Sequence, residues 1–292
     1  MAKEGFVVGS GSLAAQVWRR FRRHRLALLG ATVISVLVVI AILAPVVALQ
    51  DPYRVDLRCV RASPSRAHIM GTDTAGRDVW SRLVYGSRVS LSVGLVAVSI
   101  STTIGTILGS IAGYYRGVVD SVIMRATDVL MCFPTLIVII ILIAVLEPSI
   151  YNIMMAIGLL GWGGTCRLVR GQFLSLREKD FVLAARCLGA SDGRIIFRHI
   201  LPSVVTYLTV GVSFGIAGAI LSEAGLSFLG VGVPPPTASW GNMLYYARSI
   251  EVLEKLAWLW VPPGIMIVIT TLSINFVGDG LRDALDPWMV TK

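Results

Sequence analysis

Six long apolar stretches without Asp, Glu, Lys or Arg limit the folds open to this chain more than any other feature. An α-helix rises about 1.5 Å per residue, so about 20 residues cross the hydrocarbon core of a bilayer. The pattern therefore predicts an all-α, polytopic membrane protein with six transmembrane helices. We place these helices at Leu26–Leu49, Val89–Gly113, Val129–Leu146, Ser149–Cys166, Ile200–Ser222 and Leu256–Gly278.

The composition supports a bilayer as the solvent. Of the 292 residues, 55% are hydrophobic and only 15% are charged, and the mean hydropathy is +0.77. A soluble domain of this length could not bury so much apolar surface. The first apolar stretch is longer than the core of a cleaved signal peptide, so we expect it to remain as a membrane anchor. The third and fourth stretches are the shortest, and we expect a tight turn between them at Glu147-Pro148.

The distribution of Lys and Arg predicts the orientation. With the N-terminus inside, 17 of the 26 basic residues lie in cytoplasmic segments and 9 lie outside. This excess favours a multi-pass protein of the cell membrane with both termini cytoplasmic. Seven of the 9 outside residues lie between Gln50 and Arg88 and depart from the rule. The predicted segments are a cytoplasmic N-terminal segment (1–25), the first transmembrane helix (26–49), an extracytoplasmic loop with an amphipathic elbow helix (50–88), a five-helix core (89–278) and a cytoplasmic tail (279–292).

Several kinds of chemistry are missing from the sequence. The six apolar stretches hold no ionisable group of the kind that carries a coupling ion, which argues against a self-sufficient secondary carrier. No lysine lies in a phosphate-binding loop, so the chain cannot use ATP alone. We predict no catalytic residue, no metal site and no bound cofactor, and the chain is not expected to be an enzyme. An ATPase-independent channel or carrier remains the alternative from another functional class.

The segment AARCLGASDGRIIFRHILP, residues 184–202, is the longest polar interruption in the second half of the chain. Good helix formers precede Gly189, which is expected to end that helix in a left-handed conformation. Ser191 is expected to cap a second short helix that runs to Arg198 and buries Ile195, Ile196 and Phe197 on one face. Arg194 and Arg198 would lie on another side. Ala184 and Ala185 would offer a flat surface that another protein can approach closely.

This segment resembles the "EAA" loop of ABC importer permeases, with two alanines, a glycine after three further residues and a Leu-Pro close. Leu183 stands where the pattern has Glu, and His199 stands where it often has Ile; both are common in the peptide branch. Three further stretches resemble the C-type subunits of dipeptide/oligopeptide permeases. They are HIMGTDTAGRDVWSRLVYGSRVSL (68–91), LSEAGLSFLGVGVPPPTASWGNML (221–244) and NFVGDGLRDALDPW (275–288).

The resemblance implies a type I ABC importer permease fold with a cytoplasmic coupling helix in loop 172–202. It implies an ATP-driven importer of dipeptides or oligopeptides, with nickel complexes or haem as other substrates of the same family. The implied partners are a B-type permease subunit, ATP-binding subunits that hold ATP and Mg²⁺ on the cytoplasmic face, and an extracytoplasmic substrate-binding lipoprotein; nucleic acid is not expected. The residues expected to couple to the ATPase are Ala184, Ala185, Gly189, Ser191, Asp192, Arg194, Ile195, Phe197 and Arg198.

Two features leave alternatives open. Glu223, at the outer end of the fifth stretch, is either a gate residue in contact with substrate or receptor, or a buried hydrogen-bonding group that orders the following Gly-Pro loop. Gly105 and Gly109 have the spacing that lets helix backbones approach closely. That close approach is expected within this chain rather than between two copies.

Overall fold

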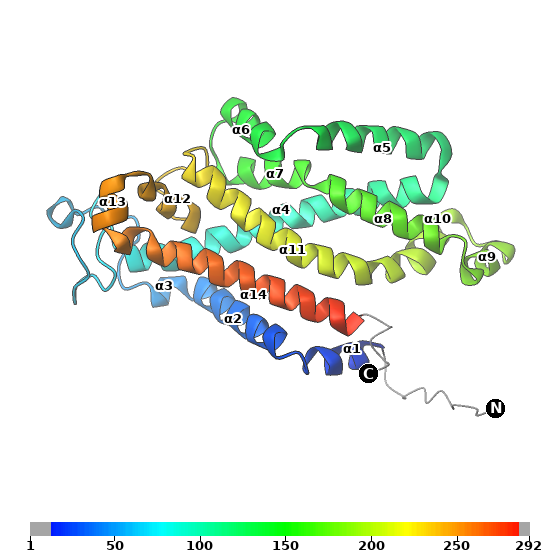
Figure 1. The fold of residues 1–292 in the computed structure, drawn as a ribbon, viewed down its shortest axis with the longest axis horizontal. Helices are drawn as coiled ribbons and strands as arrows, with labels where there is room; N and C mark the ends of the chain where they lie inside the picture. Colours follow the sequence, from blue (N-terminus) through cyan, green and yellow to red (C-terminus); the bar gives the residue numbers. More distant parts are fainter. Residues whose placement is uncertain (1–12, 286–292) are drawn as a thin grey trace.

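The computed structural model describes residues 13 to 285, and within that range the chain is built of helices. The ends of the predicted N-terminal segment and tail, residues 1–12 and 286–292, lie outside the described residues. The longer helices run side by side in an elongated bundle (Figure 1). They are α1 (Leu13–Phe21), α2 (Arg25–Ile42), α4 (Val79–Tyr115), α5 (Gly117–Cys132), α6 (Thr135–Leu146), α7 (Ile150–Leu160), α8 (Trp162–Leu176), α11 (Leu201–Phe228) and α14 (Val261–Leu285).

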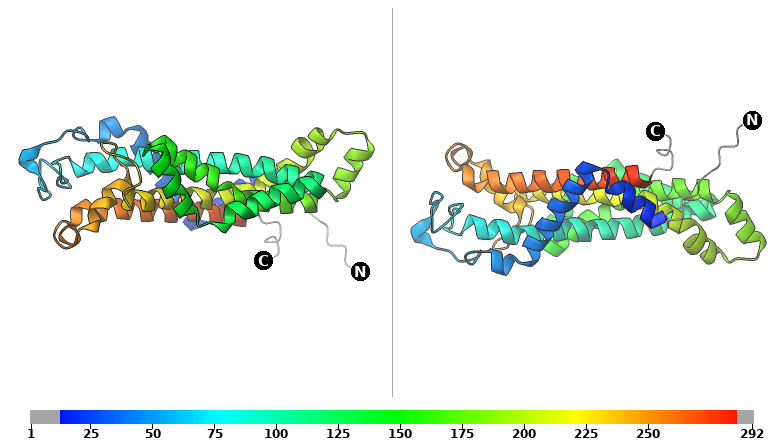
Figure 2. Two further views of the ribbon diagram at one scale, coloured as in Figure 1. Left: turned by 90° about the horizontal axis from the view of Figure 1, so that it is seen from above. Right: turned by 90° about the horizontal axis from the view of Figure 1, so that it is seen from below.

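The short helices gather at the two ends of the bundle. At one end, which we call the α9 end, lie α9 (Asp180–Cys187) and α10 (Asp192–Arg194). At the opposite end, which we call the loop end, lie α3 (Ala44–Val47), α12 (Trp240–Leu244), α13 (Ile250–Lys255) and the segment between α3 and α4. The views from above and from below show the same arrangement, with α9 and α10 at one end and the segment between α3 and α4 at the other (Figure 2).

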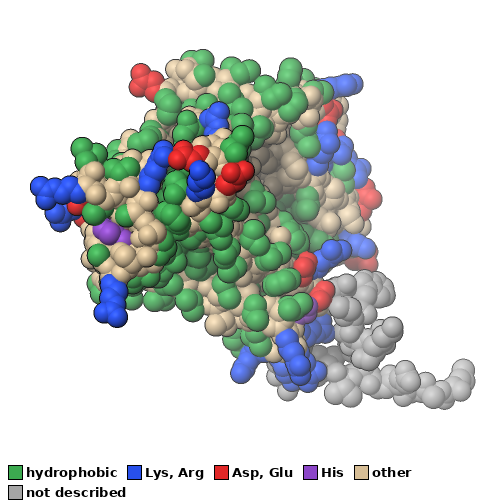
Figure 3. All heavy atoms as spheres, turned by 60° about the vertical axis from the view of Figure 1, so that its left-hand side comes forward, with side chains coloured by type: hydrophobic (Ala, Val, Ile, Leu, Met, Phe, Trp, Pro, Cys, Tyr) green, Lys and Arg blue, Asp and Glu red, His purple; other side chains and the backbone are tan. Residues whose placement is uncertain are grey.

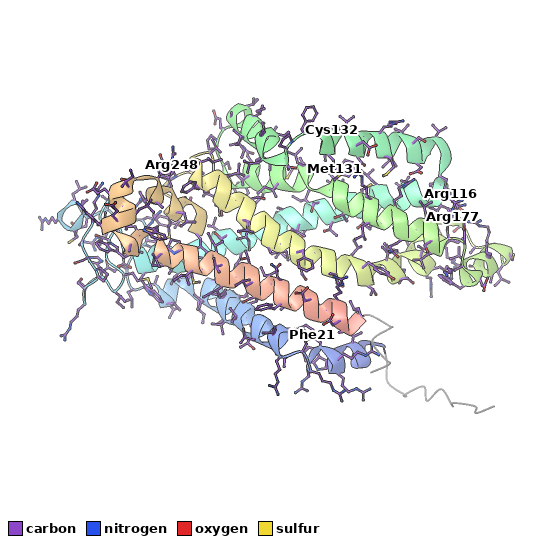
Figure 4. All side chains as sticks on the ribbon, viewed as in Figure 1. Phe21, Arg116, Met131, Cys132, Arg177 and Arg248 are labelled. Atoms are coloured by element: carbon purple, nitrogen blue, oxygen red, sulfur yellow. The ribbon has the colours of Figure 1, made fainter. Side chains whose placement is uncertain are left out.

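Four helices in the described range are long and apolar enough to cross a membrane: α2, α4, α14 and a continuous helix from Asp192 to Phe228. They match the first, second, fifth and sixth predicted spans. The third predicted span is divided, because α5 and α6 meet at an angle of 85°. Pro134 disfavours helical dihedrals at Phe133, whose ψ is 141°, and this ends α5 beside Cys132 (Figure 4). When α5 and α6 count as one span, the described helices supply five candidate spans by length and composition.

The fourth predicted span also differs in its bounds. It is divided at Gly161 into α7 and α8, and α8 continues ten residues beyond the predicted end at Cys166. This extension contains two arginines, and both form ion pairs with α5. Arg170 pairs with Asp120, and Arg167 Nη2 lies 2.6 Å from Asp128 Oδ1. Each arginine of the extension therefore has an acidic partner on α5.

Two boundary predictions are corrected at the helix ends. The expected elbow helix before the second span is absent, because α4 begins at Val79 and continues without a break to Tyr115. Asp78 caps α4 by accepting a hydrogen bond from the N–H of Ser81 at 2.8 Å. The sixth span runs on to Leu285, so Asp283 of the predicted tail lies in the last turn of α14, where it pairs with His24 at 3.6 Å.

The close contact expected from the paired glycines lies within this chain. Gly105, Gly109 and Gly113 of α4 all face α8, and an added Cβ at Gly109 would lie 2.5 Å from the carbonyl oxygen of Cys166. Backbones that approach so closely gain dispersion contacts along the whole helix pair. The glycines therefore allow the backbones of α4 and α8 to lie in close contact.

Candidate coupling site

The segment predicted to couple the chain to an ATPase forms the α9 end. As predicted, Gly189 ends the first helix of this segment: its φ is +77°, in the left-handed region that glycine adopts without a steric penalty. The N–H of Gly189 donates to the carbonyl of Arg186, and the N–H of Ala190 donates to the carbonyl of Ala185, both at 3.0 Å. These two bonds form a Schellman motif, which fixes the direction in which the chain leaves α9.

The two alanines do not share a surface, in contrast to the expectation. Ala185 and Val182 lie on the buried side of α9, whereas Ala184 is exposed on the other side. Residues three and four positions apart share a helix face, so the outward face continues through Phe181 and Leu188. Leu188 is 88% exposed, which makes it the most exposed apolar side chain of α9 and its cap. Ala185 therefore supports α9 from inside, and the outward face belongs to its neighbours.

The second short helix is not a separate element. The chain stays helical from Asp192 through a π-helical turn, Ile195–Ile200, into α11. Pro202 lacks the N–H that would continue the α-helical ladder, and the wider turn before it absorbs this defect, with the N–H of Leu201 donating to the carbonyl of Ile196. Ser191 occupies the N-cap position but makes no side-chain capping bond, so its predicted capping bond is absent.

The side chains of this helix divide between the bundle and the surface. Ile195 and Ile196 are buried, as expected, but Phe197 is 69% exposed and points away from them. Arg194 and Arg198 are exposed as well. The error over Phe197 follows from the helix period, because three consecutive residues span too wide an arc to share one face. Phe197 is thus exposed, like Phe181, Ala184 and Leu188 of the α9 segment, and it also lines a pocket against α4. We call these four exposed apolar side chains, taken together, the coupling face.

A set of polar contacts braces this loop against the end of α4. The hydroxyl of Tyr114 donates to Asp192 Oδ1 at 2.6 Å, and Arg177 donates to the backbone carbonyl of Tyr114. The guanidinium of Arg186 lies over the Tyr114 ring at 5.9 Å, a cation–π contact. Arg116, which directly follows α4, pairs with Glu178, and Arg116 and Arg177 both lie toward the α9 end (Figure 4). The coupling face is therefore displayed on a loop of fixed geometry.

The sequence reasoning missed Tyr114 and its partners. Their signal was an aromatic pair, Tyr114-Tyr115, at the end of an otherwise small and aliphatic span. An aromatic ring with a polar tip at such a position is suited to join a buried helix to a polar loop. Asp192, which was singled out, is the acceptor in this contact.

Glu223 lies far from this region, toward the loop end of α11. Its side chain is fully buried, and Oε1 accepts hydrogen bonds from Ser227 at 2.7 Å and from Ser239 at 2.8 Å. In this conformation Glu223 cannot touch a receptor or substrate, which corrects the gate-contact prediction. The geometry is that of the alternative, in which the carboxyl group joins the end of α11 to the start of α12 across the Gly-Pro loop.

Replacing Glu223 by leucine is expected to lower the thermal stability of the protein. The substitution leaves two buried hydroxyl groups without their shared acceptor, and each such loss costs about 1–3 kcal/mol. Glu223→Gln keeps a carbonyl oxygen for both serines and is the matched control, with a smaller expected loss. Thermal unfolding of the purified protein in detergent measures the difference. Equal melting temperatures for Glu223→Leu and the wild type would contradict this role.

Comparisons with known proteins bear on both halves of the chain. Residues 105–291 match the family described as "Binding-protein-dependent transport system inner membrane component". Residues 12–64 match the "N-terminal TM domain of oligopeptide transport permease C". A putative peptide permease protein of Brucella suis biovar 1 is 42% identical over 268 residues, covering 92% of this chain and 89% of that protein.

A further relative and one solved structure are also similar to this chain. The glutathione transport system permease protein of Escherichia coli O6:K15:H31 is 42% identical over 273 residues, covering 93% of this chain and 89% of that protein. A solved structure of the MetNI methionine ABC transporter in an inward-facing conformation superposes with a TM-score of 0.56 at 16% identity. The match covers 70% of this chain and 96% of that chain, and it supports a shared helical fold.

Proposed function

Because this chain belongs to the family of binding-protein-dependent inner membrane transport components, we propose that it forms one half of the membrane pore of a peptide importer and is driven through its coupling face. It is a multi-pass permease of the inner membrane, and a separate subunit hydrolyses ATP. Membership in this family implies an ATPase and a binding protein as partners. We infer below which parts of this chain contact these partners.

The coupling face is the single observation that carries the proposal. Leu188 and Phe197 are 88% and 69% exposed, yet they lie on a loop braced by Tyr114 and Asp192. Large apolar side chains held rigidly at a surface are typical of protein interfaces, because little conformational entropy is lost when they bind. We infer that the ATPase subunit covers this face. The proposed contact residues are Phe181, Ala184, Leu188, Arg194, Phe197 and Arg198, and the proposed supporting residues are Ala185, Gly189, Ser191, Asp192 and Ile195.

The proposed arrangement puts the α9 end and both termini in the cytoplasm. The 17 basic residues assigned to inside segments support this orientation. The loop end then faces outward, where an extracytoplasmic substrate-binding lipoprotein delivers its cargo. A B-type permease completes the pore, and ATP and Mg²⁺ are bound by the partner ATPases and not by this chain.

The transported substrates are proposed to be short peptides. Relatives at 42% identity are named as putative peptide permeases and as a glutathione transport permease. The residues 129–146 and 200–222 that were assigned to spans contain no Asp, Glu, Lys, Arg or His, so no charged side chain in them selects one substrate charge over another. Dipeptides are the first substrate to test, and nickel complexes and haem are the competing cargoes.

The proposed mechanism is a switch between two arrangements of the paired permeases. ATP binding closes the two ATPases, and this closure moves the coupling face that they hold. The ligand can shift the equilibrium only because it favours one arrangement over the other. The bound peptide then passes from the binding protein into the opened cavity.

Uptake by the complete complex in proteoliposomes tests the proposal. We expect uptake of a radiolabelled dipeptide only when ATP is inside and the loaded binding protein is outside. Parallel vesicles receive a nickel chelate or haem, and uptake of one of these alone would replace the peptide assignment. Uptake by this chain without ATP or partners would instead establish the channel or carrier alternative.

A further inference from the structure

Seven arginines between Gln50 and Arg88 lie on the side of the membrane where basic residues are disfavoured. Four of them have partners that explain their presence. Arg77 Nε lies 2.7 Å from Asp73 Oδ2, and Arg82 is buried beside the same carboxylate at 3.5 Å. Arg88 donates to the carbonyls of Ala41 and Ile42, and Arg61 pairs with Glu251 of α13.

The other three arginines have no such explanation. Arg54, Arg58 and Arg66 are exposed, and no ion pair joins any of them to a carboxylate within the described part of the chain. The nearby Asp51 and Asp56 are engaged in the turns of the backbone, where each accepts a hydrogen bond from the N–H two residues ahead. Three unpaired cations therefore remain on a single loop.

Exposed apolar side chains lie among these cations. Leu57 is 77% exposed, and Val55 is 55% exposed. Both lie between Arg54 and Arg58 along the chain, on either side of Asp56. An apolar centre with arginine around it is the composition of a protein–protein interface, where Arg is enriched and a few apolar residues supply most of the binding energy.

This loop is ordered by its own hydrogen bonds. The N–H of Ala62 donates to Thr72 Oγ1 at 2.8 Å, and the N–H of Arg61 donates to the carbonyl of Asp73 at 3.0 Å. His68 contacts Asp78, the capping residue of α4, at 3.0 Å. A surface that is already fixed in shape loses little entropy when a partner binds.

The position of the loop favours a protein partner over the membrane surface. The segment between α3 and α4 extends beyond the ends of the long helices at the loop end (Figure 1). Figure 3 turns the loop end toward the viewer, and Lys and Arg side chains project there next to hydrophobic ones. Lipid headgroups lie at the level where spanning helices end. A loop that extends beyond those ends is therefore placed to contact a protein in the aqueous phase and not the membrane surface.

We propose that Arg54, Arg58 and Arg66, around Val55 and Leu57, form a docking surface for an acidic face of the extracytoplasmic binding protein. This inference rests on the proposed function and specifies where and by what chemistry the binding protein is held. Opposite charges across such an interface speed association and fix its orientation.

Charge reversal in the assembled complex tests the docking surface. The triple variant Arg54→Glu, Arg58→Glu, Arg66→Glu is expected to raise the binding-protein concentration for half-maximal ATPase stimulation by about tenfold or more. The probe is the transporter's own binding protein loaded with a synthetic dipeptide. The Arg→Lys triple variant keeps all three charges, and we expect it to stay within about twofold of the wild type. For the wild type, that concentration should rise with salt, and for the charge-reversed complex it should fall with salt, because salt then screens a repulsion.

A photo-crosslinking residue at position 57 supplies a second readout that does not depend on stimulation. We expect it to capture the binding protein, identified by mass spectrometry. If the charge-reversed complex is stimulated at the wild-type concentration and position 57 captures only lipid, the docking proposal is overturned while the importer assignment stands. If the wild-type complex is not stimulated by its binding protein at all, the proposed function itself fails.

Discussion

Replacing Phe197 by aspartate is expected to abolish ATP-driven uptake while leaving the complex in the membrane. Phe197 is 69% exposed, so the isolated bundle loses little packing when the ring is removed. At the proposed interface the same change removes an aromatic contact and buries a charge. Central interface residues of this kind contribute about 2 kcal/mol or more, which corresponds to about 30-fold weaker binding. Uptake and ATPase co-purification both measure the loss.

The control for this substitution is Ile250→Asp. Ile250 is 73% exposed, like Phe197, but it lies on α13 at the loop end. If aspartate acts only by making an exposed position polar, both variants behave alike. If the coupling face is the ATPase contact, only Phe197→Asp releases the ATPase. Full uptake by Phe197→Asp would remove the central observation from the proposed function.

Replacing Gly109 by leucine is expected to prevent the protein from accumulating in a folded form. A Cβ at this position lies 2.5 Å from the carbonyl oxygen of Cys166 and 2.8 Å from the Cβ of Val169. Neither atom is the end of a flexible side chain, so the two helices must separate. Overpacking of a well-packed core costs about 1–3 kcal/mol, and here the lost α4–α8 contact adds to it. The amount of monodisperse protein extracted from membranes measures the effect.

Gly171→Leu is the matched comparison for Gly109→Leu. Gly171 also lies within a long helix, α8, but apart from the backbone of that helix no atom of the described residues lies within 4 Å of an added Cβ there. Both substitutions remove a helical glycine and add the same hydrophobic side chain. We therefore expect Gly171→Leu to accumulate normally. Equal loss of both variants would mean that α4 and α8 do not pack as described.

The sequence predicted the elements whose length and composition suffice to define them. The first, second, fifth and sixth spans match helices α2, α4, α11 and α14, because each exceeds the bilayer thickness without a charge. The third and fourth predicted spans are each interrupted in the structure, because Pro134 and Gly161 divide helices whose hydropathy is continuous. Hydropathy reflects the environment that a residue prefers and not the direction of the backbone. The 85° bend between α5 and α6 therefore cannot be predicted from hydropathy.

The coupling loop was located correctly from its residues, but its orientation was not. Gly189 was identified by the left-handed conformation that only glycine adopts easily, and the structure confirms it. Ala185 was expected at the surface and is buried, whereas Phe197 was expected to be buried and is exposed. The helix period alone accounts for the error over Phe197. The inward side of α9 is set by packing of Val182 with Tyr114 and Phe173, which are distant in sequence, so the residues of α9 alone do not reveal it. The family resemblance is confirmed by relatives at 42% identity.

The continuity of the helix from Asp192 to Phe228 has a mechanical consequence. It contains 37 residues, and at about 1.5 Å per residue its length is about 55 Å. A rod of that length, tilted by about 5° at one end, displaces its opposite end by about 5 Å. Glu223 sits near that opposite end, bonded to Ser239. A small tilt at the Ile195 end of this helix is thus amplified into a displacement at the Glu223 end that is larger than the length of a hydrogen bond.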